Sequence, residues 1–218
     1  MNIILLAPPA AGKGTQAKLL SNNYQLPHIS TGDMLRDAAR RNDELGSKIK
    51  ELMAKGEFVS DELIGKIVEN RLSSLDCQKG YILDGFPRNM KQVILYKKIL
   101  EKLNLDLGYV LYLDVDEHTL EERITGRMVC KNCEAIYNIN NPILTPIEEG
   151  ICDKCHGELF RRSDDTREAF QMRYQTYLEL TKPIIDYYNE LGVLYKIDFG
   201  SKEATFNQIK LILDREMN

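Results

Sequence analysis

The chain alternates between short, uniformly apolar runs and longer stretches in which apolar residues recur every three or four positions. Uniform runs of roughly four to eight residues are typical of buried strands, and the longer spacing is typical of amphipathic helices. The apolar runs predict five strands, at residues 2–6, 26–30, 80–84, 109–114 and 192–198. The helical spacing predicts helices that begin near residues 16, 34, 44, 60, 89, 117 and 204. This alternation favours an α/β fold, a five-stranded parallel sheet wrapped by helices.

One segment, residues 127–161, breaks this alternation. It contains an Asn-Asn-Pro turn, Pro146 and Gly150, and it has no clear helical spacing. We interpret it as an insertion built of short strands and turns. It also holds two Cys-x-x-Cys pairs, Cys130/Cys133 and Cys152/Cys155, with eighteen residues between them.

Cysteine pairs at this spacing are typical of a tetrahedral structural zinc site that has no open coordination position. Reduced thiol pairs or disulfides are the alternative, and a cytoplasmic location disfavours disulfides. A segment of about 30 residues has too small a core to fold alone, so a bound metal would stabilise it. His156 is expected beside the site, and Cys77 is expected to be an inert residue near the start of a strand.

The first strand leads into a loop of small residues and then into Gly12-Lys13-Gly14-Thr15. A strand, a small-residue loop with Gly-Lys and a hydroxyl, and a helix together form the context of a phosphate-binding loop. The unpaired N–H groups of a helix N-terminus and its partial positive charge hold phosphate. Lys13 would add a mobile charge, and the Thr15 hydroxyl could reach Mg²⁺ or a phosphate oxygen. Because Ala7 and Gly14 depart from the usual pattern, an ordinary strand-to-helix turn is the alternative.

Four arginines bracket the insertion. Arg123 and Arg127 lie four residues apart on an expected helix face that leads into it, Arg162 follows it, and Arg173 lies on the next helix. Singly, each would be a solvated surface residue. Together, opposite a phosphate loop, they are interpreted as a clamp on a transferring phosphoryl group. The pair Asp164–Asp165 is expected to cap the helix that carries Arg173.

A carboxylate, Asp84, stands at the end of the strand predicted at residues 80–84. Ligands of parallel sheets bind outside the carboxyl ends of the strands, where residues 7–15, 30–33 and 84–88 all fall. Asp84 is therefore the expected carboxylate for Mg²⁺ bound through water. The alternative is that Asp84 caps the following helix.

Composition narrows the function. The net charge of −4, from 29 basic and 33 acidic residues, argues against a general nucleic-acid-binding protein, whose surface would be basic. No run approaches the roughly 18 apolar residues of a membrane span. The N-terminal apolar run is too short for a signal peptide and lacks the preceding basic residues. We therefore expect a cytoplasmic protein with no nucleic-acid or membrane partner.

Four motifs resemble those of the adenylate kinase family: Lys13-Gly14-Thr15-Gln16-Ala17, Ser30-Thr31-Gly32-Asp33-Met34-Leu35-Arg36, Asp84-Gly85-Phe86-Pro87-Arg88 and Gln92. The resemblance covers effectively the whole chain and includes the long form with a four-cysteine zinc lid. It implies a P-loop NTPase type of fold. The core would be residues 1–29, 60–126 and 162–218, the AMP-binding subdomain residues 30–59, and the lid residues 127–161.

The same resemblance implies a monomeric phosphotransferase that catalyses ATP + AMP ⇌ 2 ADP with Mg²⁺, by in-line transfer with lid closure, in purine salvage and energy homeostasis. The residues that would bind ATP are Ala10, Ala11, Gly12, Lys13, Gly14, Thr15, Arg123, Arg127 and Gly200. The residues that would bind AMP are Thr31, Arg36, Met53, Glu57, Val59, Gly85, Arg88, Gln92, Arg162 and Arg173. The catalytic set would be Lys13, Arg88, Arg123, Arg127, Arg162 and Arg173. Asp84 would serve Mg²⁺, and Cys130, Cys133, Cys152 and Cys155 would bind Zn²⁺.

Two positions depart from the family loop, which usually reads Gly-x-x-Gly-x-Gly-Lys, because Ala7 and Ala10 stand where glycine is usual. If either adopts a positive φ, the strain is about 1–2 kcal/mol, and we expect some loss of ATP affinity or rate. Two other functions stay open. One is a related kinase with another acceptor or with GTP as donor. The other is a zinc-ribbon nucleic-acid-binding module on an inactive nucleotide-binding scaffold.

Overall fold

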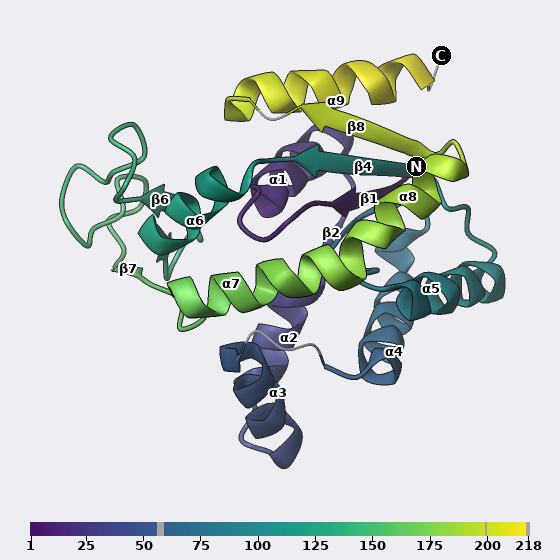
Figure 1. The fold of residues 1–218 in the computed structure, drawn as a ribbon, viewed down its shortest axis with the longest axis horizontal. Helices are drawn as coiled ribbons and strands as arrows, with labels where there is room; N and C mark the ends of the chain where they lie inside the picture. Colours follow the sequence, from purple (N-terminus) through teal and green to yellow (C-terminus); the bar gives the residue numbers. More distant parts are fainter. Residues whose placement is uncertain (56–58, 199, 217–218) are drawn as a thin grey trace.

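The computed structural model describes residues 1–55, 59–198 and 200–216 (Figure 1). Its central sheet consists of β1 (Asn2–Leu6), β2 (His28–Ser30), β3 (Tyr81–Asp84), β4 (Tyr109–Asp114) and β8 (Leu194–Asp198). The order across the sheet is β2-β3-β1-β4-β8, and every neighbouring pair is parallel. The predicted five-stranded parallel sheet is confirmed, although β2 and β8 begin two residues later than predicted.

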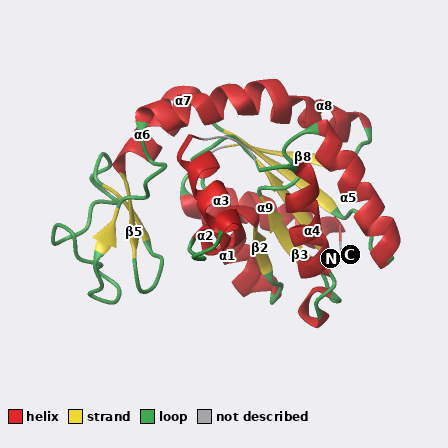
Figure 2. Cartoon of the chain, turned by 90° about the horizontal axis from the view of Figure 1, so that it is seen from below, coloured by secondary structure: helices red, strands yellow, loops and turns green. Residues whose placement is uncertain are grey.

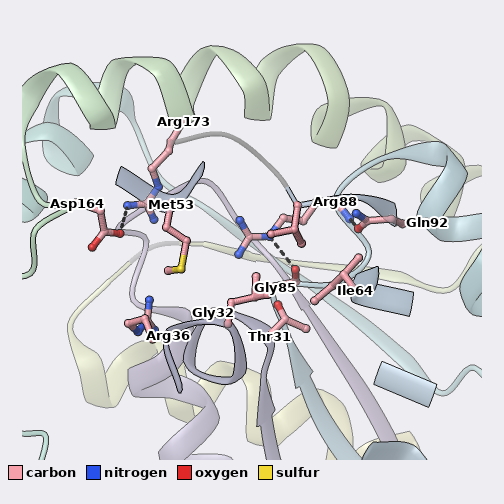
Figure 3. Close-up of a pocket in the computed structure, with 12 residues that line it drawn as sticks. Thr31, Gly32, Arg36, Met53, Ile64, Gly85, Arg88, Gln92, Asp164 and Arg173 are labelled. Atoms are coloured by element: carbon pink, nitrogen blue, oxygen red, sulfur yellow. Dashed lines mark hydrogen bonds and ion pairs between the residues drawn. The ribbon is translucent and has the colours of Figure 1, made fainter. Parts of the chain in front are cut away.

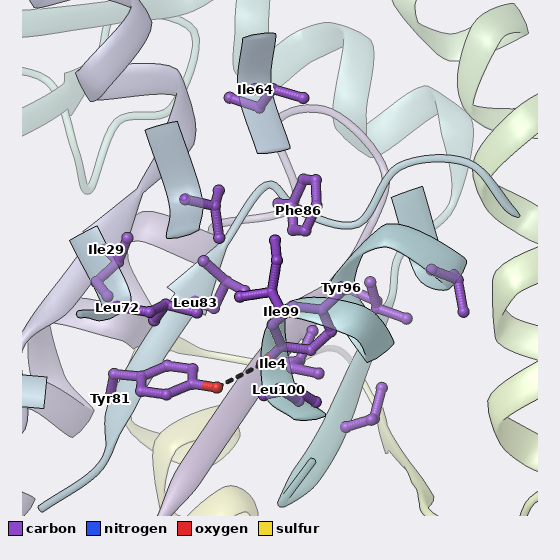
Figure 4. Packing of buried hydrophobic residues seen from close by; sticks show 14 of the residues in the cluster. Ile4, Ile29, Ile64, Leu72, Tyr81, Leu83, Phe86, Tyr96, Ile99 and Leu100 are labelled. Carbon is purple, nitrogen blue, oxygen red and sulfur yellow. Dashed lines mark hydrogen bonds between the residues drawn. The ribbon is translucent and has the colours of Figure 1, made fainter. Parts of the chain in front are cut away.

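Two helical layers cover the sheet. They contain α1 (Lys13–Tyr24), α4 (Asp61–Leu72), α5 (Met90–Leu103), α6 (Glu117–Gly126), α8 (Lys182–Glu190) and α9 (Lys202–Glu216). Successive side chains of a strand point to opposite faces, so Ile4 packs with α4, α5 and α8, whereas Ile3 packs with α1 and α9. Figure 4 shows the first layer, in which the hydroxyls of Tyr81 and Tyr96 are 2.6 Å apart. The central strands β1 and β3 are buried on both faces, which accounts for their apolar sequences.

Other helices lie at the carboxyl edge of the sheet. There α2 (Thr31–Ala39) and α3 (Glu44–Lys55) project away from it below α7 (Arg167–Thr176) (Figure 1). Ser30 and Ser60 cap α2 and α4, since their side chains accept from N–H groups of these helices at 3.2 and 3.3 Å. A 3₁₀ turn spans Leu75–Cys77, and α7 continues through the π-helical turn η2 (Tyr177–Thr181) into α8. None of the helices in the described ranges is long and apolar enough to cross a membrane.

The insertion forms a second, smaller sheet. β5 (Arg127–Cys130) lies between β6 (Ile136–Asn138) and β7 (Leu159–Phe160), and both pairings are antiparallel. This sheet stands at one end of the molecule, joined to the rest through α6 and α7 (Figure 2). Its own small core contains Cys130, Tyr137, Cys152 and Leu159. The predicted short strands and turns of the insertion are confirmed.

Two glycines, Gly108 and Gly192, have almost the same backbone conformation but different surroundings. The φ angles of Gly108 and Gly192 are 75° and 70°. A Cβ on Gly108 would overlap the backbone oxygen of Asn2, whereas a Cβ on Gly192 would have no neighbour within 4 Å.

We expect Gly192→Ala to lower the free energy of unfolding by about 1–2 kcal/mol, through left-handed backbone strain alone. Gly108→Ala should cost about 1–3 kcal/mol more, because β1 and the start of β4 must also move apart. Equilibrium urea unfolding of both variants measures the difference. Equal losses would contradict the steric argument.

Candidate active site

The order of the strands brings the predicted motifs together. β2, β3 and β1 are neighbours, and their register pairs Ser30 with Asp84 and Asp84 with Leu5. The segments that follow these three residues therefore begin side by side at the carboxyl edge of the sheet. Residues separated by up to about 80 positions in the sequence meet there, where α/β proteins bind their ligands.

The loop between β1 and α1 has the geometry of an anion site. Gly12 occupies the N-cap position of α1 with φ 90° and offers no side chain to the first turn, so an anion can take up N–H groups there. The Lys13 side chain folds back over the loop, and its Nζ donates to the carbonyl oxygens of Ala7 at 3.1 Å and Pro8 at 3.4 Å. Of the two unusual alanines, Ala10 has a positive φ of 63° and Ala7 does not.

Lys13 is partly buried among charged groups. Burial, partly offset by the Asp84 carboxylate and reinforced by the guanidinium groups of Arg88 and Arg173, lowers the pKa of Lys13 to about 8. Burial alone would raise the pKa of Asp84, but His28 and Lys13 together hold it below its usual value. The distance from His28 Nε2 to Asp84 Oδ2 is 3.6 Å. The loop thus faces a buried carboxylate and several cations.

Asp84 lies beside the start of α1, since a Cβ on Gly14 would be 3.9 Å from its Oδ2. The alternative role of Asp84, a cap for the following helix, is wrong. Asn89 caps α5, and its side chain accepts from the backbone N–H of Gln92 at 2.8 Å. Asp84 is therefore available to the site.

A pocket lies between α2, the loop after β3 and α7. It is lined by Thr31, Gly32, Leu35, Arg36, Met53, Val59, Ile64, Gly85, Arg88, Gln92, Asp164 and Arg173. Of the residues that the resemblance assigns to AMP, Arg162 lines a neighbouring cavity and Glu57 lies outside the described residues; the others line this pocket. Figure 3 shows Arg36, Arg88 and Arg173 approaching it from different elements.

Arg88 is held at both its backbone and its side chain. Its N–H donates to Gln92 Oε1 at 2.7 Å, and its carbonyl oxygen accepts from Thr181 Oγ1 at 2.8 Å. Its Nε donates to the carbonyl oxygen of Gly85 at 2.7 Å. Burial lowers the pKa of Arg88, yet a guanidinium group stays charged at neutral pH. A fixed, partly buried cation therefore stands at one wall of the pocket.

The neighbouring cavity separates α2 and α3 from the insertion, and Arg36 and Arg162 both line it. Burial, reinforced by the charges of Arg36 and Arg127, lowers the pKa of Arg162 to about 10. Lys18 Nζ of α1 lies 2.7 Å from Glu134 Oε2 of the insertion. The insertion therefore reaches across the carboxyl edge of the sheet.

Asp164 and Asp165 pair with arginines and do not cap α7. The predicted cap is wrong because Thr166 occupies that position, its side chain accepting from an N–H of the first turn at 3.1 Å. Asp165 is buried and accepts from two nitrogens of Arg127, including Nε at 2.7 Å. Asp164 Oδ2 accepts from Arg173 Nη1 at 3.1 Å. Each of these arginines thus already contacts a carboxylate.

The prediction that Arg123 and Arg127 share a helix face is wrong. Because α6 ends at Gly126, Arg127 is the first residue of β5. Arg123 lies near the loop after β1, since a Cβ on Gly12 would be 3.9 Å from its Nη1. Both side chains therefore lie near the site, Arg123 from helix α6 and Arg127 from strand β5.

The segment after β8 is tied to α1. Gln16 Nε2 donates to the carbonyl oxygen of Lys202 at 3.0 Å, and the N–H of Gly200 donates to Thr205 Oγ1 at 3.3 Å. Phe199 lies outside the described residues. Gly200 therefore follows the carboxyl end of β8, in a segment that α1 contacts directly.

The four cysteines of the two predicted pairs converge. Their Sγ atoms all lie within 4.8 Å of one another, with 3.4 Å between Cys130 and Cys155 and 3.6 Å between Cys133 and Cys152. Tetrahedral zinc with bonds of about 2.3 Å puts its sulfur ligands roughly 3.8 Å apart. A disulfide would need about 2.05 Å. The group therefore fits a tetrahedral metal ion.

The surroundings of Cys152 favour the thiolate that a metal requires. Burial alone would raise its pKa, but hydrogen bonds from the Tyr137 hydroxyl and from backbone N–H groups lower it to about 6. The Tyr137 oxygen is 3.4 Å from Cys152 Sγ and accepts from the N–H of Asp153 at 2.8 Å. In Cys155 the backbone N–H of Gly157 lowers the pKa, but hydrogen bonds to Cys133 and Cys130 outweigh it and raise the pKa to about 12. The case for a metal ion therefore rests on the convergence of the four Sγ atoms.

Comparison with known proteins decides the family. A family model described as "Adenylate kinase" matches residues 5–193. The chain belongs to the adenylate kinase family. It is 47% identical to an adenylate kinase of Archaeoglobus fulgidus over 217 residues, which is 99% of each chain. It is 46% identical to one of Thermotoga neapolitana over 213 residues, 96% of each chain, and to one of Methanosarcina barkeri over 218 residues, 99% of each chain.

Some features of this adenylate kinase family site are not predicted from the sequence. Leu35 and Ile64 complete the walls of the arginine pocket, a position that helical spacing does not distinguish from one in the core. Arg36 pairs with Asp33, which the three-residue spacing on a helix could have indicated. The carboxylate partners of Arg127 and Arg173 had no such signal, because they depend on how α7 leaves the insertion.

Ala10 provides a test of loop strain. Because a left-handed alanine costs about 1–2 kcal/mol, we expect Ala10→Gly to hold the loop in its present conformation more of the time and to raise kcat/KM for nucleotide phosphoryl transfer. Ala7→Gly is the control, since Ala7 has no positive φ to relieve. Unchanged kinetics in Ala10→Gly would mean that alanine is accommodated at φ 63° without strain.

Proposed function

We propose that this protein transfers the γ-phosphoryl group of Mg-ATP to AMP, reversibly, and so forms two molecules of ADP. One observation carries the proposal: an anion-binding loop and an arginine pocket both lie beside Asp84, at the carboxyl edge of the sheet. Lys13 from the loop and Arg88 from the pocket each interact electrostatically with Asp84. A donor phosphate and an acceptor phosphate would therefore lie side by side. The adenylate kinases that the chain resembles over nearly its whole length support this assignment.

The donor would lie on the loop. Residues 10–15 would hold the ATP phosphates through N–H groups and Lys13, and Arg123 with the segment near Gly200 would flank the base. The insertion, residues 127–161, would close over it. The Lys18–Glu134 ion pair supports a closing movement of this kind, because it joins the insertion to α1.

The acceptor would lie in the arginine pocket. Arg36 and Arg88 would hold the AMP phosphate, each able to donate two parallel hydrogen bonds. The apolar side chains of Met53, Val59 and Ile64 would contact the base. Residues 30–59 would form the subdomain that closes over this substrate.

Such a site needs no general base, because the attacking phosphate oxygen of AMP is already an anion. The catalytic contribution is positioning and neutralisation of charge by Lys13 and by the four arginines of the clamp. Mg²⁺ bound with ATP supplies further positive charge to the phosphates, and Asp84 would hold its water ligands. Closure of both mobile parts would exclude water, whose attack would waste ATP.

The four cysteines would hold Zn²⁺ as a structural ion. Burial of Cys130 and Cys152 and the mutual Sγ distances support this proposal. With only four residues in its buried core, the insertion would depend on the metal for its fold. The protein is proposed to act as a monomer in the cytoplasm, which gel filtration and cell fractionation can test.

Metal removal should expose that dependence. We expect about one zinc ion per chain, and a strong chelator should lower the melting temperature by roughly 5–10 °C, because the ion binds only the folded insertion. Elemental analysis and differential scanning calorimetry measure both quantities. Cys155→Ser should lose the metal and Cys77→Ser should keep it, so equal metal content in the two variants would contradict the site.

Arg88 provides the direct test of function. We expect the purified protein to form ADP from ATP and AMP only with Mg²⁺, and Arg88→Ala to lower kcat at least about a hundredfold, as loss of a charge-stabilising donor does. Arg215→Ala, which removes an exposed arginine at the end of α9, is the matched control.

A coupled assay with AMP, GMP, CMP and UMP as acceptors, and with ATP or GTP as donor, separates adenylate kinase activity from that of a related kinase. If wild-type protein leaves AMP unchanged, the proposed function is wrong. Near-normal turnover in Arg88→Ala would remove that residue from the phosphate site. Filter binding with DNA and RNA tests the remaining alternative.

A further inference from the structure

Asp61 connects three elements behind the arginine pocket. It is the first residue of α4, after the cap Ser60. Its Oδ1 accepts from Asn89 Nδ2 at 2.9 Å and from Gln92 Nε2 at 2.8 Å. The two amides lie at the start of α5, 28 and 31 residues further along the chain. No step of the proposed phosphoryl transfer uses this carboxylate.

The contacts of Asp61 fix the orientation of the Gln92 amide. A carboxylate at neutral pH only accepts hydrogen bonds, so Gln92 must turn its NH₂ group toward Asp61. The opposite end faces the backbone N–H of Arg88, which only donates and lies 2.7 Å from Gln92 Oε1. Both partners therefore demand the same orientation of an amide whose two ends are otherwise nearly alike. Gln92 is 3% exposed, so water does not replace either partner and allow the amide to turn over.

Gln92 keeps hydrogen-bonding capacity for a ligand. One amide N–H and one lone pair of Oε1 remain after the contacts with Asp61 and Arg88. Adenine presents an amino donor at position 6, whereas guanine presents a carbonyl acceptor at the same place. Beside it, N1 of adenine accepts whereas N1–H of guanine donates, so the two bases present donor and acceptor in opposite order. An amide of fixed orientation matches one order and opposes the other. The base cannot turn over to restore the match if Arg36 and Arg88 hold the phosphate of the same nucleotide.

We propose that Asp61 is a specificity-determining positioning residue, which makes the acceptor pocket select adenine over guanine by locking the Gln92 amide. The inference rests on the proposed function, because it takes the arginine pocket as the site of a nucleoside monophosphate. Asp61 acts only through Gln92 and touches no substrate.

Substitution of Asp61 tests this role. Asp61→Ala removes the charged one of the two partners that orient Gln92 and leaves the backbone N–H of Arg88 as the remaining one. We expect the ratio of kcat/KM for AMP to that for GMP to fall roughly tenfold or more, the effect of losing one hydrogen bond to a charged group. The KM for AMP should rise while the KM for ATP stays unchanged. Asp61→Asn keeps an accepting oxygen and should restore most of the discrimination. Asp61→Ser, which suits a helix start but is too short to reach Gln92, replaces Asp61→Ala if that variant does not fold.

Glu62 offers a matched control. It is the next acidic residue in the first turn of α4, and its side chain is exposed. Glu62→Ala removes the same charge from the same helix end, so it reports any effect of the helix dipole or of net charge alone. We expect its ratio of AMP to GMP to equal that of the wild type.

Calorimetric binding of AMP and of GMP to each variant gives the same ratio without phosphoryl transfer. Wild-type protein that binds AMP but forms no ADP would overturn the proposed function and leave this inference standing. An equal loss for AMP and GMP in Asp61→Ala, or an unchanged ratio, would overturn the inference and leave the proposed function intact. A fall in the ratio with Glu62→Ala would assign the effect to charge and also overturn it.

Discussion

The structure depends on positively charged side chains that the fold has partly withdrawn from water and placed around one cleft. Lys13, Arg88, Arg162 and Arg173 are all partly buried, and this burial is the largest influence lowering the pKa of each. A buried cation is costly unless an anion accompanies it. A phosphate chain is the anion that these groups would share in the proposed reaction. Two of them have a carboxylate partner within the chain: Asp84 acts on Lys13 electrostatically, and Asp164 pairs with Arg173.

The topology of the sheet explains how these charges come together. Placing β3 between β2 and β1 puts three loops at one edge, and the parallel register aligns the ends of the strands. The insertion adds Arg127 at the start of β5, and α7, the helix that follows the insertion, adds Arg173. Neither group of residues could form the cleft alone. The small sheet therefore contributes charge as well as cover.

Much of this arrangement could be predicted from the sequence, because it follows from local patterns. Apolar runs located the strands, and the cysteine spacing located a cluster whose Sγ atoms do converge. The errors concern contacts that local patterns do not determine. Asp164 and Asp165 resembled caps, but Thr166 stands one residue closer to the helix and leaves them to bind arginines. Arg127 could not be assigned to a strand because a helix and a strand meet at Gly126 without any loop between them.

The carboxylates that contact the arginines have a consequence for turnover. Asp33, Asp164 and Asp165 belong to the same chain as Arg36, Arg173 and Arg127, so they would remain tethered nearby when the phosphate of the proposed reaction displaced them. A tethered group competes at an effective concentration in the millimolar range or above. Each departing nucleotide would thus leave an arginine that a neighbouring side chain reclaims at once. A competing carboxylate of this kind would weaken binding of the product and speed its release, the step that limits the rate of many enzymes.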